Sequence, residues 1–337
     1  MEPVHGDSWA MPAALSVAGA LVLWGATRAR LRRGSADMSL LARIARRDHA
    51  AAEAGKLLPI ATKPHIVLDG GIPFVVSVVE KTAMKAKPRA KDAAALAPLD
   101  AFETVDPDLL VCGGDGAFPD HNIVLNKFPV VTGHLVIATR EFHPQSEPLT
   151  PSDLLALWMV VESTDGLGFF NAGRIAGASQ PRKHTQAIPR PRPPPGHPPH
   201  AFPVEAAAEA ALAEAAAAGA STARVAAFDF PHVLAPVPPA ASAASAASPE
   251  AARSAAGDAL CSLYGALLRE VGACDSAYNL LLTRRWMMVV PRTRERWGPV
   301  SVNAVGFAGL LLARGDAGEA LSEAGPLTAL RAVAAGE

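Results

Sequence analysis

The sequence predicts an α+β protein whose sheet is antiparallel. Segments typical of strands and of helices follow one another irregularly, and several strand segments form pairs separated by a short polar turn. The regular strand–helix alternation of a parallel α/β sheet does not occur, and neither does the dinucleotide-binding fingerprint G-x-G-x-x-G. Together these observations favour a mixed fold with hairpin-like strand pairs.

The first part of the chain supplies one helix and then several strands. Apolar residues recur at helical spacing within residues 38–59, which predicts a helix there. The segment "GGIPFVVSVVEK" predicts a turn followed by a strand, and the Lys/Ala-rich residues 82–100 predict a loop. Short strands are expected in "DLLVCGG" and in "HNIVLNKFPVVTGHLVIATREF", where residues 130–139 predict a strand, a turn and a second strand.

The clearest helix begins at Pro151. Thr150 can cap its N-terminus, Pro151 suits its first turn, and Asp153 completes a capping box. An apolar stripe at helical spacing then comprises Leu154, Leu157, Trp158 and Val161. "GLGFFNAG" follows as a short strand that ends in glycine.

Low-complexity segments interrupt the second half of the chain. Eight prolines between Pro189 and Pro203 predict an extended linker or loop. "EAAAEAALAEAAAAG" predicts a helix, and "PVPPAASAASAASPEAARSAAG" predicts a mobile loop. The predicted order then comprises the helix "DALCSLYGALLREVG", the hairpin "YNLLLTRRWMMVVPR", the segment "SVNAVGFAGLLLAR" and a final helix.

Length and composition describe a globular protein of a reducing compartment. The 337 residues suffice for one large domain or two ordinary ones, and half of them are apolar, although alanine inflates that share. Cys112, Cys261 and Cys274 are far apart in sequence. This sparse, odd set argues against a disulfide framework and against a cysteine-rich zinc site, so we expect them to act as small apolar residues.

The charge balance excludes one class of partner. With 31 basic and 32 acidic residues the formal net charge is −1, which gives no electrostatic reason to expect binding to nucleic acid or to an anionic membrane. A local basic pocket for a phosphate compound remains compatible with this balance.

The first 38 residues differ in character from the rest. They are apolar from Trp9 to Thr27, basic up to Arg33, and poor in acidic residues before Asp37. This pattern fits a removable organelle-targeting segment, a signal anchor or an unstructured extension. We therefore treat residues 1–38 as an N-terminal extension, expect a cytoplasmic or organellar protein, and expect no stable membrane association of residues 39–337.

The stretch "ASQPRKHTQAIP" carries the candidate chemistry. The chain has no P-loop, no H-E-x-x-H, no G-x-S-x-G and no kinase motifs. On an extended segment Arg182, His184 and Gln186 share one face. A neutral imidazole is a good nucleophile near pH 7, and a glutamine amide can donate to a phosphate oxygen. The spacing alone also fits a simpler interpretation, in which His184 is an exposed histidine in a polar turn.

Longer blocks resolve this ambiguity. "FFNAGRIAGASQPRKHTQAIP" closely resembles the ATP adenylyltransferases, also called diadenosine tetraphosphate (Ap4A) phosphorylases. This family belongs to the histidine-triad (HIT) superfamily and is related to galactose-1-phosphate uridylyltransferase. Further blocks, including "LNKF" and "YNLLLTRRWMMVVPR", resemble the family in the same order over roughly residues 39–335. The resemblance implies a HIT-like antiparallel sheet with flanking helices and a C-terminal part that completes the nucleotide site.

The resemblance also implies a division of the chain into segments. Residues 39–200 would form a HIT-like catalytic domain, and residues 258–335 would form the C-terminal ATP adenylyltransferase domain. Between them, residues 201–257 would hold an Ala/Pro-rich helix and a low-complexity loop.

Site roles follow from the same resemblance. His184 stands where the family has its nucleophile, and Gln186 stands in place of the last histidine of HIT hydrolases, a change associated with transfer. The other implied nucleotide- and phosphate-binding residues are Lys81, Asn126, Lys127, Asn171, Gly177, Ala178, Ser179, Gln180, Thr283, Met288 and Arg292. Backbone N–H groups around Gly173 and Gly177, with Ser179 and Gln180, could form an anion-binding nest.

Two departures from the family pattern stand out. The family usually has H-x-H-x-Q, whereas the first position here is Arg182. Because that residue can orient the nucleophile through its main-chain carbonyl, we expect activity to survive the change, and its side chain could contact a polyphosphate tail. The family's asparagine-proline-phenylalanine is missing near "PLDAFETVDPDLL".

The predicted activity is phosphorolysis of Ap4A to ATP and ADP, reversible as adenylyl transfer, through a nucleotidyl-histidine. Alternatives are a nucleotidyltransferase acting on a nucleoside diphosphate sugar, and a nucleotide-binding sensor impaired in catalysis. We expect Ap4A, ATP, ADP and inorganic phosphate as partners, no tightly bound cofactor, and at most Mg²⁺ arriving with the nucleotide. No metal ligands are predicted, since His121, His134 and His143 lack recognisable ligand spacing. The sequence leaves the oligomeric state open.

Overall fold

The computed structural model describes residues 39–79, 100–190, 202–242 and 248–334. The N-terminal extension 1–38, Lys81 and most of the proline-rich segment after Pro189 lie outside the described residues. Within the described ranges, no helix has both the length and the apolar character needed to cross a bilayer.

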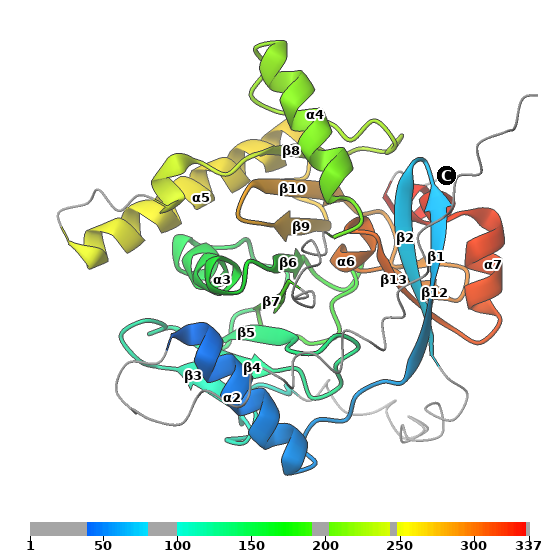
Figure 1. Cartoon of the computed structure of the whole chain (residues 1–337). Coiled ribbons are helices and arrows are strands. Elements are labelled where there is room, and N and C mark those ends of the chain that lie inside the picture. The colour runs from blue at the N-terminus through cyan, green and yellow to red at the C-terminus, as the bar shows by residue number, and fades with distance from the viewer. Residues whose placement is uncertain (1–38, 80–99, 191–201, 243–247, 335–337) are drawn as a thin grey trace, which may run out of the picture. The chain divides into compact units, whose positions relative to one another are not determined.

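An eight-stranded antiparallel sheet forms the centre of the fold (Figure 1). Its strand order is β3-β4-β5-β7-β6-β9-β10-β8. The strands are β3 (Leu110–Gly113), β4 (His121–Leu125), β5 (Leu135–Thr139), β6 (Leu167–Asn171), β7 (His184–Ile188), β8 (Val233–Pro236), β9 (Tyr278–Leu282) and β10 (Trp286–Pro291). Because β6 pairs with β9, strands from the two halves of the chain share one sheet. The predicted α+β class with an antiparallel sheet is confirmed.

A second sheet of three strands lies beside the first. The hairpin of β1 (Thr62–Asp69) and β2 (Ile72–Val79) turns at Gly70 and Gly71, both of which have positive φ. β13 (Leu310–Arg314) pairs with β2 in parallel, which is an exception to the antiparallel pattern. A short ribbon joins β11 (Arg296–Trp297) to β12 (Val300–Ser301). The C-terminal part of the chain therefore completes a sheet that begins near the N-terminus.

Helices cover both faces of the central sheet. They are α2 (Leu40–Glu53), α3 (Pro151–Thr164), α4 (Glu205–Ala217), α5 (Pro249–Val271), α6 (Ala304–Phe307), α7 (Ala317–Ala324) and α8 (Pro326–Ala334), with a 3₁₀ turn η3 (Pro239–Ser242). In Figure 1, α3 and α5 lie on one side of the sheet, and α6 and the small sheet lie on the other. Gly168 of β6 lets α3 approach closely, since a Cβ there would lie 2.7 Å from Val161.

Local capping fixes where α3 begins, as predicted. The Thr150 hydroxyl accepts a hydrogen bond from the Asp153 N–H, and the Thr150 N–H donates to the Asp153 carboxylate at 2.8 Å. α5 begins earlier than predicted, because Ser248 caps a helix whose first residue is Pro249. Composition alone predicts a mobile loop for "PEAARSAAG", but its alanines favour a helix once a cap is present.

The expected organisation differs from the structure in three further places. Only residues 135–139 of the predicted pair at 130–139 form a strand, and the preceding residues form the turn from β4. β1 is absent from the sequence prediction, although Ile66, Val67 and Leu68 form a short apolar run; most of its side chains are exposed, including Ile66 and Leu68 on one face. Residues 201–257 hold not only a helix and loop but also β8, the edge strand beside β10.

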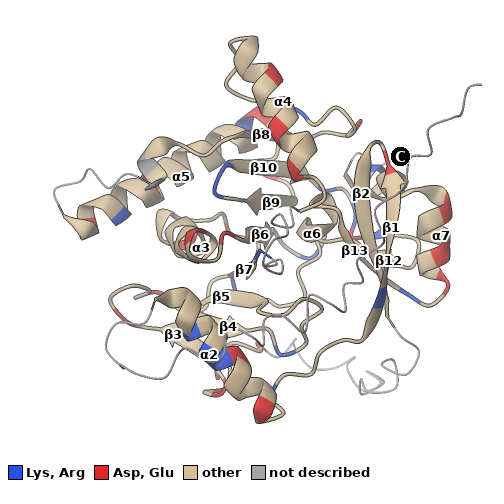
Figure 2. Cartoon of the chain, viewed as in Figure 1, with Lys and Arg blue, Asp and Glu red and all other residues tan. Residues whose placement is uncertain are grey.

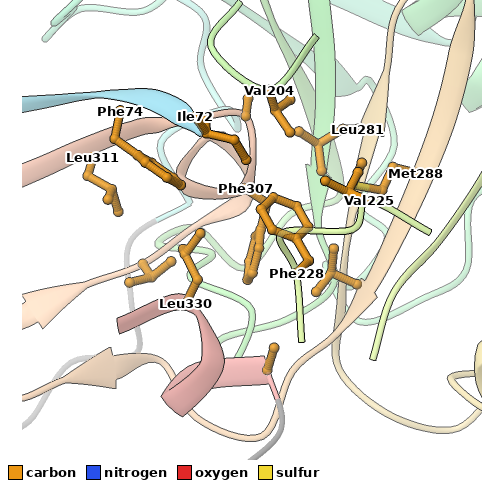
Figure 3. Packing of buried hydrophobic residues seen from close by; sticks show 14 of the residues in the cluster. Ile72, Phe74, Val204, Val225, Phe228, Leu281, Met288, Phe307, Leu311 and Leu330 are labelled. Atoms are coloured by element: carbon orange, nitrogen blue, oxygen red, sulfur yellow. The ribbon is translucent and has the colours of Figure 1, made fainter. Parts of the chain in front are cut away.

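The main hydrophobic core joins the small sheet to the central one (Figure 3). Phe74 of β2 and Phe307 of α6 are fully buried, as is Met288 of β10. Leu330 of α8 closes the cluster from the C-terminal side. Each such side chain contributes about 1.5–3 kcal/mol by leaving water, so this cluster holds the C-terminal helices firmly behind the sheet strands that carry the site.

The sign of the charged residues differs between the labelled helices. Figure 2 shows basic and acidic residues interspersed on α2, whereas α7 carries acidic residues only.

Candidate active site

β7 places His184 near the middle of the central sheet, between β5 and β6. His184 and Gln186 share one face of this strand. Lys183, on the opposite face, pairs with Asp153 of α3, so His184 and Gln186 point away from that helix. His184 is only 5% exposed, and Gln186 is partly exposed. The sequence prediction that these two side chains line up is confirmed.

The imidazole of His184 is held by the main chain. Its Nδ1 lies 2.8 Å from the carbonyl oxygen of Arg182. A carbonyl can only accept, so Nδ1 carries the proton and the lone pair is on Nε2. No hydrogen bond to Nε2 is made by any described residue. The ring is therefore prepared for attack through Nε2.

Burial keeps this imidazole neutral. Removal from water lowers the pKa of His184 below its ordinary value, and this effect outweighs the opposing effects of the Arg182 carbonyl and the Asp100 charge. A neutral ring is the nucleophilic form, so the buried position suits His184 to attack at neutral pH.

Gln145 fixes the main chain at the start of β7, and sequence reasoning missed it. Its Oε1 accepts from the His184 N–H at 2.7 Å, while its Nε2 donates to the carbonyls of His184 and Asn171. The amide thus bridges β7 and β6 at the position where the two strands diverge. No local signal marks this role, because Gln145 lies about forty positions earlier in a loop.

A chain of hydrogen bonds orients Gln186. The Phe128 N–H donates to Asn126 Oδ1, so Asn126 Nδ2 is the group that faces His134 Nδ1, at 3.1 Å. Burial lowers the pKa of His134 to about 4, and its single proton must then lie on Nε2, which is 2.9 Å from Gln186 Oε1. The amide NH₂ of Gln186 is left for a ligand.

The loop after β6 rests on a buried polar network. Asn171 Oδ1 accepts from the Ala304 N–H and from Asn279 Nδ2, at 2.9 and 2.8 Å. Arg292 donates to Asn279 Oδ1 and to the Ala176 carbonyl. Asn171, Asn279 and Arg292 are all at most 4% exposed. This network ties the loop of residues 172–180 to β9, β10 and α6, and Asn279 was not foreseen from the sequence.

The predicted loop residues are brought near His184, but several of their polar groups are already bonded. The Gly177 N–H donates to the Arg174 carbonyl and the Ala178 N–H to the Gly173 carbonyl. Gln180 Oε1 accepts from the Ala101 N–H at 3.2 Å, and Ser179 is exposed. Of the nest expected around Gly173 and Gly177 with Ser179 and Gln180, the Gly177 N–H is therefore used in a turn within the loop, and the exposed Ser179 side chain is left as a short donor.

Met288 and Thr283, which the family resemblance implies as nucleotide contacts, lie in the protein interior. Met288 has no exposed surface and packs in the main core. The Thr283 hydroxyl accepts from the N–H groups of Arg285 and Trp286 and so closes the hairpin between β9 and β10. Neither side chain offers a surface to a nucleotide. Arg292 and Asn171 are likewise committed to the network under the loop.

Lys127 is exposed, with its Nζ 5.9 Å from the centre of the Phe128 ring. It follows Asn126 at the end of β4, so it lies close to the hydrogen-bond chain that reaches Gln186.

The reverse face of β7 is anchored to α3. Lys183 Nζ lies 3.2 Å from Asp153 Oδ2, and His121 Nε2 lies 2.8 Å from Asp153 Oδ1. Burial alone would raise the pKa of Asp153, but hydrogen bonds from His121 and Thr150 and the Lys183 charge lower it to about 2. His121, like His134 and His143, has a protein partner. The part of the chain that is described contains no cluster of three or more metal-ligating side chains.

Fold and site together define the class of protein. A buried histidine on an antiparallel sheet, held by a main-chain carbonyl and followed two residues later by a glutamine, fits a nucleotidyltransferase with a HIT-like fold. Two family models give the particular assignment. The Ap4A phosphorylase N-terminal domain matches residues 31–210, and the ATP adenylyltransferase C-terminal domain matches residues 226–336. The chain belongs to the Ap4A phosphorylase family.

Individual relatives agree with this assignment. Diadenosine tetraphosphate phosphorylase 2 of Saccharomyces cerevisiae is 27% identical over 243 residues, which cover 64% of this chain and 69% of that protein. Protein APA1 of the same yeast is 24% identical over 268 residues, which cover 73% and 75%. The crystal structure of yeast Ap4A phosphorylase Apa2 in complex with AMP superposes with a TM-score of 0.66 at 25% identity, covering 89% of this chain and 97% of that chain.

Proposed function

We propose that the protein catalyses the phosphorolysis of Ap4A, giving ATP and ADP. Family membership and the likeness to a yeast Ap4A phosphorylase support this substrate. The observation that carries the mechanism is the 2.8 Å contact between His184 Nδ1 and the Arg182 carbonyl, because it directs the lone pair of Nε2 outward. In reverse, the same steps transfer an adenylyl group from ADP to ATP and release inorganic phosphate.

The first step makes a covalent intermediate. The Nε2 lone pair attacks the α-phosphorus of one adenosine, and an Nε2–P bond forms. The bond from that phosphorus to the bridging oxygen breaks, and ATP leaves with the electron pair. The proton stays on Nδ1, where the Arg182 carbonyl stabilises the positive charge that develops on the ring.

The second step releases the nucleotide. An oxygen of inorganic phosphate attacks the phosphorus of the adenylyl-histidine, the Nε2–P bond breaks, and ADP forms while the imidazole becomes neutral again. Gln186 would donate its amide NH₂ to an oxygen of the transferred phosphoryl group in both steps. Because an amide has no acidic proton to supply, Gln186 binds the phosphoryl group without protonating the leaving group.

The remaining contacts of this proposal concern phosphate groups. Ser179 and Lys127 are exposed side chains near the nucleophile strand that can bind phosphate oxygens, and Lys81 is a further candidate outside the described residues. Mg²⁺ would arrive with the polyphosphate rather than be held by the protein, since the described residues contain no cluster of metal-ligating side chains.

The test uses the full chain with Ap4A, in the presence and absence of inorganic phosphate, and products separated by chromatography. We expect ATP and ADP only when phosphate is present. His184→Asn is expected to lower the turnover number by about 10⁴-fold or more, because the nucleophile is lost. His143→Asn, which changes an exposed histidine paired with Glu147, is the matched control and should stay near wild type. Cleavage at equal rate without phosphate would contradict phosphorolysis.

A further inference from the structure

The side chain of Arg182 is buried and bonded within the protein, so it supports the structure and does not bind phosphate. Its guanidinium is 7% exposed, and Nε and Nη2 both donate to Asp100 Oδ2, at 2.8 and 2.7 Å. Nη1 donates to the carbonyls of Arg140 and Thr139, at 2.8 and 3.3 Å. With these donors engaged, the guanidinium faces inward, so the contact with a polyphosphate tail expected from the sequence is wrong.

The other oxygen of Asp100 continues the connection. Asp100 Oδ1 accepts from the Phe102 N–H at 3.0 Å, and the intervening Ala101 N–H donates to Gln180 Oε1. Phe102 in turn packs on the nucleophile, with its ring centre 5.2 Å from that of His184. A continuous path of contacts therefore runs from the Arg182 side chain through Asp100 to the ring that covers the imidazole.

The two departures from the family pattern meet at this contact. Arg182 stands where the family usually has histidine, and "DAF", residues 100–102, lies in the stretch where the family's asparagine-proline-phenylalanine is missing. An asparagine at position 100 could still accept from the Phe102 N–H. However, the NH₂ group of that asparagine would then face the guanidinium of Arg182, and two donors cannot bond to each other. A neutral histidine at position 182 has an acceptor nitrogen and could accept from the asparagine NH₂.

We propose that Arg182 and Asp100 are a matched positioning pair, replacing histidine and asparagine together, whose role is to seat Phe102 against the imidazole of His184. Neither residue touches the reacting atoms. The pair acts through Phe102, which keeps water from the ring, and through the fixed main chain of Arg182, whose carbonyl orients Nδ1. The inference rests on His184 being the nucleophile of the proposed function.

The predicted change in the pKa of His184 depends on the titratable and charged groups near its ring. Among the described residues, those that face His184 from other elements are Asp100, from the loop before β3, and His134, which immediately precedes β5. Removing the Asp100 charge would by itself lower the pKa of His184. Releasing Phe102 would hydrate the ring and raise that pKa. The sign of the change therefore separates a charge effect from a seating effect.

The experiment compares Asp100→Asn, Arg182→His and the double variant in the full chain. Each single variant is expected to lose about tenfold in turnover number, and the double variant, which restores the family's pair, to return to within about threefold of wild type. In parallel, the pKa of His184 is measured by NMR on histidine-labelled free protein, with its resonance identified by its loss in His184→Asn. We expect Asp100→Asn to raise this pKa and the double variant to restore it.

Two further variants complete the test. Phe102→Ala leaves the ion pair intact and is expected to raise the pKa of His184 as Asp100→Asn does. Asp106→Asn, in a partly exposed pair with Lys56, is the control and should change neither readout. A lowered pKa in Asp100→Asn, or a double variant whose loss is the product of the single losses, overturns the proposal. If wild type lacks phosphorolysis, the proposed function fails while the NMR titration still decides the role of the pair.

Discussion

Nδ1 of His184 lies 2.8 Å from the main-chain oxygen of Arg182, so the proposed nucleophile is oriented by a group that every amino acid possesses. This relationship explains how the fold tolerates arginine where the family usually has histidine. The side chain at position 182 is not needed to orient the His184 ring, and in this protein it forms the ion pair with Asp100.

The pH dependence of turnover follows from the buried position of His184. Attack requires the neutral ring, so the rate falls when pH drops through the pKa of His184. Because burial lowers that pKa, we expect the acidic limb of the kcat/KM profile to lie below the ordinary titration range of histidine. The profile is measured with Ap4A at saturating phosphate. An acidic limb above pH 7 would contradict a buried neutral nucleophile, provided that thermal unfolding shows the protein folded throughout.

His134 is predicted to act through Gln186. His134→Phe keeps a ring beside Phe169, with which His134 is in contact, but removes the donor to Gln186 Oε1. The Gln186 amide can then rotate, and we expect the turnover number to fall by about ten- to a hundredfold with a smaller change in KM. Steady-state kinetics at varied Ap4A measures both quantities.

The matched control for this variant is His143→Phe, which changes an exposed histidine bonded to Glu147. Equal losses in the two variants would show that the effect of His134→Phe is not specific to the hydrogen-bond chain. An unchanged turnover number in His134→Phe would remove the argument that Gln186 needs a fixed orientation.

The parts of this protein that follow local rules could be predicted from sequence. Thr150 and Asp153 form the expected capping box, because a cap depends only on residues within one turn. His184 and Gln186 share a face because side chains alternate along any strand. The hairpin of β9 and β10 also forms where a polar turn separates two apolar runs.

The remaining features depend on contacts between distant segments. Gln145 bonds to His184 across 39 positions, and Asn279 bonds to Asn171 across 108. A polar residue of this kind carries no local pattern that distinguishes it from a surface residue. Resemblance to the family found Asn171 and Arg292, but it could not tell a side chain that contacts a ligand from one that supports the loop beside it.

Asp153 is predicted to stabilise the protein in a pH-dependent way. Because its pKa is lowered to about 2 in the folded protein, its contribution is present above the unfolded-state pKa near 4 and is lost as pH falls from there toward 2. Asp153→Asn should lower the free energy of unfolding by about 3 kcal/mol at pH 7, since buried Lys183 and His121 lose their partner.

Urea unfolding at pH 7 and at acidic pH checks this prediction. The difference between wild type and Asp153→Asn should shrink as the pH approaches 2, because the wild-type carboxylate is then protonated. Asp229→Asn, which changes an exposed carboxylate paired with Arg331, should have little effect at either pH. A difference that stays constant with pH would mean that the loss comes from packing and not from charge.

A substitution at Arg292 tests whether this residue supports the loop beside the site or contacts the substrate. Its guanidinium donates to Asn279, to the carbonyls of Ala176 and Val333, and to two further main-chain oxygens. Lysine keeps the charge but cannot serve this many acceptors from one plane. If Arg292 supports the loop, Arg292→Lys should lower the free energy of unfolding by about 2–4 kcal/mol and raise the KM for Ap4A by a similar factor at every phosphate concentration. Calorimetry and kinetics on the same preparation measure both effects. A variant of unchanged stability with weakened phosphate binding would instead show that Arg292 contacts the substrate.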